Sequence, residues 1–237
     1  MTKGPLAVNW GTWRLDEPQA GTFGVATVEL ENAGTVTWGE TVLLSYHWLD
    51  GRDNPIVWDG LRTPLPTVSP GESVTVEARV RSPIPPGRYR FTPDLVVEYR
   101  AWVSQLGSSL AAREIEVLPR EGTPHTELPG WVSPAADWRE RVAAAHAEGY
   151  GGVAGTVEWL GGSSRRRPHE LDPYAPGPGR VTGFAYPLIC PSVLDGITLD
   201  RLPEVAGLPA FAAPIDEPWI YDGRIVLRAD PKARGHR

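Results

Sequence analysis

Along residues 8–118, short apolar runs alternate with turns built from Gly, Pro, Asn and Asp. Within the runs, apolar and polar positions tend to alternate with a period of two, which is typical of strands that bury one face. No amphipathic segment of helix length interrupts this half, so it is expected to form an antiparallel β-sandwich. The predicted strands are Val8–Trp13, Gly24–Glu31, Thr41–Leu49, Pro55–Trp58, Ser73–Arg81, Gly87–Glu98 and Arg113–Leu118.

The breaks between these runs carry turn chemistry. Ser69–Glu72 has Pro at its first central position and Gly at its second, which is the pattern of a type II turn. Three prolines within Ser82–Gly87 remove backbone donors, so this segment cannot belong to a central strand. We therefore expect one β domain over residues 1–119.

The pattern changes after Pro119. Residues 120–132 combine Gly, Thr, Pro and His without periodicity, and we expect a linker there. A helix is predicted next, with Ser133 as its N-cap, Pro134 at its first helical position and Gly149 just past its end. Its expected apolar face is Trp138, Val142 and Ala145, with Ala135 as a further candidate.

The apolar stretch Gly152–Leu160 follows this helix and predicts a buried strand. A helix, a glycine and a buried strand resemble an αβ unit, so residues 133–237 are expected to form a small α+β domain. Residues 161–187 have the composition of a long loop, and such loops inside compact domains are often functional. The chain as a whole is therefore predicted to be mainly β with a smaller α+β part.

The first half also resembles a known family. Its signature is Asn32-Ala-Gly followed by Trp38, then Pro70-Gly-Glu, then Pro86-Gly-Arg-Tyr89. This order resembles the immunoglobulin-like or fibronectin-like sandwich modules that are appended to bacterial surface-polysaccharide and glycosyltransferase proteins. The resemblance implies a glycan, or a protein of glycan assembly, as partner.

The second half has a fainter likeness. The stretch "RVAAAHAEGYGGVAGTVEW" is similar to helix–strand segments of bacterial glycosyltransferase-like chains. No Asp-x-Asp motif for a sugar nucleotide accompanies it, which argues against a complete transferase.

Charge and cysteine content narrow the functional classes. The formal net charge is −6 and the isoelectric point about 5.4, which argues against a nucleic-acid binder. Cys190 is the sole cysteine, so an intramolecular disulfide is excluded and an oxidising compartment is not implied. No apolar stretch is long enough for a membrane span, and we expect a soluble chain that is cytoplasmic or of unknown location.

Several tryptophans are candidates for either core or binding surface. In Thr41–Leu49, alternation places Leu44, Tyr46 and Trp48 on one face. We expect Trp38 and Trp48 in the core, because a sandwich buries such side chains. Trp58 has two open interpretations: it stacks on the apolar face of a sugar, or it pairs across the sheet.

Four residues are predicted to contact a ligand: Trp58, Arg62, Trp219 and Tyr221. The aromatic rings would stack on a sugar, and arginine would supply planar hydrogen bonds. Trp219 and Tyr221 alternate onto one face of "DEPWIYDGR", where they either line a sugar site or close a second core.

The candidate catalytic residues lie in the second half. His169 and Glu170 sit in the long loop, and Asp216 and Glu217 precede Trp219. A histidine and a carboxylate can perform acid–base chemistry when they share a pocket. Adjacent side chains on an extended chain point oppositely, so Asp216 and Glu217 cannot themselves form a glycosidase pair.

Metal and cofactor sites are not predicted. The loop around Asp50 and Asp53 has acidic residues at alternating positions but lacks the order of a calcium-binding loop. Cys190 is expected to be a buried small hydrophobe, because no catalytic signature surrounds it. No sequence motif for a nucleotide cofactor is present.

Three hypotheses of function follow. The first is a non-catalytic binding or accessory protein associated with bacterial polysaccharide or its biosynthesis. The second is a carbohydrate-active enzyme, glycosyltransferase-like or glycosidase-like, with its chemistry in the second half. The third is a structural subunit of a surface or phage-like assembly, whose oligomeric state the sequence leaves open.

Overall fold

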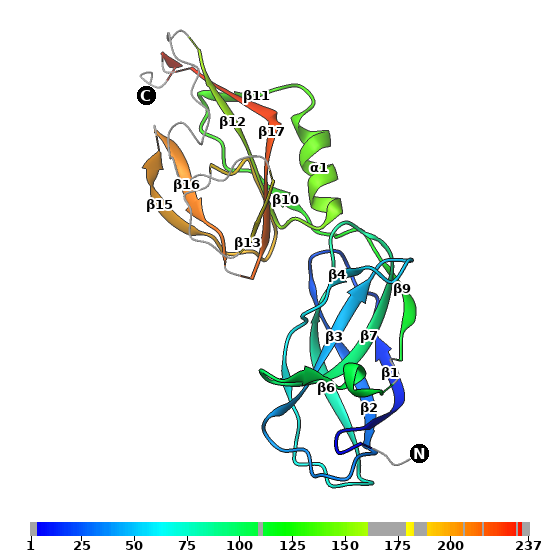
Figure 1. The fold of residues 1–237 in the computed structure, drawn as a ribbon. Coiled ribbons are helices and arrows are strands. Elements are labelled where there is room, and N and C mark those ends of the chain that lie inside the picture. Colours follow the sequence, from blue (N-terminus) through cyan, green and yellow to red (C-terminus); the bar gives the residue numbers. More distant parts are fainter. Residues whose placement is uncertain are drawn as a thin grey trace. The chain divides into compact units, whose positions relative to one another are not determined.

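The computed structural model describes residues 4–108, 111–160, 189–205, 207–214, 216–230 and 232–233, and the backbone of 179–182. Over this part the chain is mainly β with one α-helix, as predicted. It divides into two compact units (Figure 1), the first ending at Leu118 and the second beginning at Pro119. None of the described helices has the length and apolarity needed to cross a membrane.

The first unit consists of two antiparallel sheets. One has the strand order β1-β2-β6, and in the other β3 and β7 are central neighbours while β4, β5, β8 and β9 pair on their flanks. Most of these strands coincide with predicted runs, because alternation marks them clearly. Their bounds are β1 (Val8–Leu15), β2 (Phe23–Asn32), β3 (Val42–Leu49), β4 (Pro55–Val57), β5 (Thr63–Pro64), β6 (Ser73–Arg81), β7 (Gly87–Val97), β8 (Ala101–Trp102) and β9 (Arg113–Val117).

A single hydrophobic core joins these two sheets. Trp38 and Trp48 are both fully buried in it, which confirms their prediction as core residues. The Trp48 indole packs edge-on against Phe91 with ring centroids 4.8 Å apart, and its Nε1–H donates to the carbonyl of Arg81 at 3.0 Å. A large aromatic ring whose polar atom is also satisfied is a strong anchor for a sandwich.

The second unit is built around a mixed sheet of order β10-β14-β12-β17-β11, with β13 beside β17 and a separate β15–β16 hairpin. The central pair, β12 and β17, runs parallel, and α1 packs against both. The bounds are β10 (Pro124–His125), β11 (Val132–Pro134), α1 (Trp138–Glu148), β12 (Gly152–Trp159), β13 (Gly179–Thr182), β14 (Ser192–Leu194), β15 (Asp200–Val205), β16 (Leu208–Ala212) and β17 (Pro218–Ala229).

The predicted start of the helix is wrong. Val132–Pro134 form β11, whose backbone pairs with β17, and α1 begins only at Trp138. Strand pairing buries Val132 and uses the backbone that a helix start at Ser133 would require. The predicted end is confirmed, since Gly149 adopts a φ of 120° and its N–H bonds to the last turn.

The segment expected to be a linker, 120–132, belongs to the second unit. Pro124 and His125 pair with β14, and the Arg120 N–H donates to the carbonyl of Ala147 at 3.0 Å. The region expected to be one long loop, 161–187, also contains β13. Both differences come from pairings with distant strands, which local composition does not reveal.

The core makes a direct prediction for stability. Trp48→Ala should lower the free energy of unfolding of the first unit by about 3–5 kcal/mol, because it opens a large cavity. Val25→Ala, at a side chain 49% exposed on β2, should cost less than about 1 kcal/mol. Denaturant unfolding of both variants measures the difference, and equal losses would contradict the packing described here.

Candidate functional site

A hollow of about 330 Å³ opens on the sheet that contains β3 and β7. Trp58 and Arg62 come from the connection after β4, and Glu98 and Tyr99 from the turn that follows β7. Trp102 closes β8 just before the short 3₁₀ helix η1 (Val103–Leu106). Two segments far apart in the sequence, 58–62 and 96–105, therefore meet at one place.

The aromatic rings of the hollow cover a buried histidine. His47 is fully buried on the face of β3 opposite to the core residues Tyr46 and Trp48. The Trp58 ring stacks on the His47 ring with centroids 4.0 Å apart and planes 13° apart. Trp102 lies edge-on to both, 4.4 Å from His47 and 6.1 Å from Trp58.

His47 is held by hydrogen bonds at both ring nitrogens. Nδ1 faces the backbone carbonyl of Trp58, and Nε2 lies 3.2 Å from a carboxylate oxygen of Asp94. A carbonyl and a carboxylate can only accept, so the ring satisfies both when it carries two N–H groups as imidazolium. Stacked on Trp58, such a ring would gain a further cation–π attraction.

Asp94 completes this buried pair. Its carboxylate also accepts the backbone N–H of Leu95 at 2.8 Å, the N–H of Ser104 at 3.2 Å and the Ser104 hydroxyl at 2.5 Å. Three N–H or O–H donors and the His47 ring therefore surround this one carboxylate. The pair thus ties η1, which carries Ser104, to the Trp58 connection.

Arg62 is the second organising group. Its guanidinium donates to Glu98 and to Asp59, each at 2.6 Å, and it lies over the Trp102 ring at 5.0 Å. The Nη1 nitrogen of Arg62 donates to the backbone carbonyl of Gly60 and to the Ser45 hydroxyl. Burial alone would lower the pKa of Arg62, but the hydrogen bonds with Glu98 and Asp59 outweigh it and raise the pKa above its ordinary value.

The surface left for a ligand consists of aromatic faces and acceptor oxygens. Trp58 is 39% exposed. Tyr99 is fully exposed, and its backbone has a positive φ of 60°. Four of the five N–H groups of Arg62 are engaged, while Glu98 and Asp59 each use one oxygen toward it. The remaining carboxylate oxygens can accept hydroxyl groups from a ligand.

The predicted contacts Trp58 and Arg62 therefore lie in the same hollow. Arg62 acts mainly as an internal brace, which differs from the direct contact that we expected. Sequence reasoning missed Glu98 and Tyr99, although the stretch "EYRAW" after an alternating strand places them beside Trp102.

Trp219 and Tyr221 do not form a surface site, and their prediction as ligand contacts is corrected. Trp219 is fully buried beneath Gly152, where an added Cβ would lie 2.0 Å from its ring. Tyr221 is 3% exposed, and its hydroxyl shares a hydrogen bond of 2.6 Å with Thr156. The two rings close the core of the second unit, because β12 pairs directly with β17.

The proposed catalytic group is not assembled in the described part of the chain. His169 and Glu170 lie outside the described residues. Glu217 forms an ion pair with Arg120 at 2.5 Å, with both side chains largely buried. Asp216 lies next to it on an exposed turn. Glu217 thus has a structural partner in the second unit.

The other candidate groups have local structural roles. Asp50 accepts hydrogen bonds from Asn54 and Arg52, and those from Asn54 hold the pKa of Asp50 below its usual range. Cys190 is buried as predicted, and burial raises its pKa to about 12. The described residues contain no group of three or more His, Cys, Asp or Glu side chains that could hold a metal ion.

Comparison with known proteins adds little to this description. No family model and no curated protein matches the chain. One similar solved structure is a Bordetella pertussis protein that carries the name ApaA. The match has 21% identity and a TM-score of 0.23, and it covers 48% of this chain and 91% of that one. At this similarity it carries no argument about fold or function.

Gly60 makes a prediction about how the hollow is held. A Cβ at Gly60 would lie 2.5 Å from the Tyr46 carbonyl oxygen, so Gly60→Ala must push the connection away from β3. We expect a loss of about 1–3 kcal/mol in the unfolding free energy and a weaker Trp58–His47 contact, read from nuclear Overhauser effects. Gly51→Ala is the matched control, because its Cβ would meet nothing within 4 Å. An unchanged ring contact in Gly60→Ala would contradict this role.

Proposed function

We propose that the first unit binds a carbohydrate in the hollow lined by Trp58, and that the chain acts as a non-catalytic binding protein. The observation that carries this proposal is a half-exposed tryptophan ring, fixed by stacking, beside carboxylates that keep free acceptor oxygens. Sugars present an apolar C–H face and a rim of hydroxyl groups, and this arrangement offers a partner to each.

The charge distribution favours an uncharged glycan. Asp59 and Glu98 flank Arg62, so two carboxylates oppose the guanidinium charge at short range. Because most N–H groups of Arg62 are already engaged, little is left to pair with an acidic sugar. The free carboxylate oxygens instead suit neighbouring hydroxyl donors.

Size and rigidity are consistent with a short glycan segment. Ligand pockets run from roughly 300 to 1,000 Å³, and a hollow of about 330 Å³ is near the lower end. The rings are fixed by His47 and Arg62 before any ligand arrives, which reduces the ordering cost of binding. The resemblance of this half to modules of bacterial polysaccharide proteins supports the same class of ligand.

Trp58→Ala tests the proposal. On a glycan array followed by calorimetry, we expect the wild-type chain to bind a neutral oligosaccharide and the variant to bind it about tenfold more weakly or worse, because the stacking face is lost. Val25→Ala, an exposed apolar residue of the opposite sheet, should leave the affinity unchanged.

Both variants must retain the cooperative unfolding of the first unit for this comparison. Absence of any glycan signal from the folded wild-type chain would rule out the proposed function. Equal affinity in Trp58→Ala would remove Trp58 from the site.

A further inference from the structure

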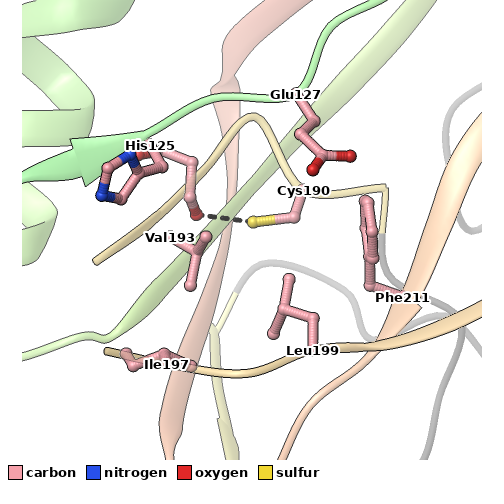
Figure 2. Close-up of a pocket in the computed structure, with 8 residues that line it drawn as sticks. His125, Glu127, Cys190, Val193, Ile197, Leu199 and Phe211 are labelled. Atoms are coloured by element: carbon pink, nitrogen blue, oxygen red, sulfur yellow. Dashed lines mark hydrogen bonds between the residues drawn. The ribbon is translucent and has the colours of Figure 1, made fainter. Parts of the chain in front are cut away.

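A separate cavity of about 190 Å³ lies within the second unit (Figure 2). It is bounded by β10, by the segment from Cys190 through β14, and by residues that follow β14 toward the β15–β16 hairpin. The lining residues that matter here are Glu127, Cys190, Ser192, Leu199 and Phe211. This cavity shares no residue with the hollow of the first unit.

Apolar side chains line one part of the cavity wall, and the exposed wall as a whole is about equally polar and apolar. Cys190 and Phe211 belong to one buried cluster with Trp219, and Val193, Ile197 and Leu199 pack against that cluster. This apolar part of the wall favours contact with an apolar group over contact with water. A cavity of about 150 Å³ suffices for benzene in another protein, so one ring with a short chain fits here.

The buried polar groups of the wall are satisfied from within the protein. The Cys190 thiol donates to the carbonyls of Val153 and Ser192, and burial raises its pKa to about 12, so it stays neutral. His146 Nδ1 donates to the Tyr150 carbonyl at 2.7 Å, which leaves Nε2 to accept the Ser192 hydroxyl at 2.9 Å. These groups therefore offer a ligand no charge and no free hydroxyl donor.

Glu127 is the exception. Its side chain is exposed at the cavity, and among the described residues it has neither a hydrogen bond nor an ion pair. Figure 2 shows the Glu127 carboxylate on the side of Cys190 and Phe211, whereas the His125 ring points away from the thiol. An unpaired anion beside an apolar cavity is complementary to a cation that carries an apolar group.

We propose that this cavity binds a small amphiphilic amine: a single ring or a branched chain of similar size inside the cavity, with its ammonium group paired to Glu127. The apolar wall contributes most of the binding, and the carboxylate selects the cationic ligand over neutral and acidic ones of the same shape. The proposal is independent of the function proposed for the first unit.

The test uses three probes of one shape: phenethylamine, 2-phenylethanol and phenylacetate, titrated into the full chain and followed by nuclear magnetic resonance. We expect saturable binding of phenethylamine with a Kd on the order of 1 mM. The alcohol should bind about threefold to tenfold more weakly, and phenylacetate more weakly still, because an exposed ion pair adds a modest gain.

Two variants locate the ligand and its charge contact. Glu127→Gln should lower the affinity for phenethylamine to that for the alcohol and leave the affinity for the alcohol unchanged. Glu140→Gln, the same change at an exposed residue of α1, should alter neither affinity. Leu199→Trp should fill the cavity and abolish binding of all three probes.

Failure of all three probes to saturate the wild-type chain would overturn the proposal. So would an undiminished affinity for phenethylamine in Glu127→Gln, or in a folded Leu199→Trp variant.

Discussion

The contact between His47 and Asp94 is the constraint on which the candidate site depends. Both groups are almost completely removed from water, which is costly unless every donor and acceptor is paired. Here each ring nitrogen has an acceptor, and the carboxylate has four donors. Removing either partner would leave an uncompensated polar group, so the surrounding segments are held in one arrangement.

This pair explains why a residue outside the central core is nevertheless buried. Alternation along β3 turns Tyr46 and Trp48 toward the core and His47 toward the opposite face. That face is covered by Trp58 and Trp102, which form a second aromatic layer above the sheet. The outer surface of this layer is what remains available to a ligand. His47 therefore positions the aromatic rings on which the proposed function depends.

The sequence allowed much of the first unit to be predicted, because its strands alternate and its turns carry Pro and Gly. Trp48 was predictable from a long alternating strand. Trp58 was left open because its exposure depends on partners that are remote in the chain. His47 and Asp94 are 47 positions apart, and no local pattern links them. The second unit was less predictable, since the parallel pairing of β12 with β17 buries Trp219 and the pairing of β11 with β17 delays the helix start.

The most direct measurement is the nitrogen-15 spectrum of the His47 ring in the folded chain, assigned by comparison with His47→Gln. Two protonated ring nitrogens, with nuclear Overhauser contacts from the ring to the Trp58 indole, are the expected result. A ring nitrogen that carries a free lone pair, or a Trp58 ring without contact to His47, would contradict a site built on this buried pair.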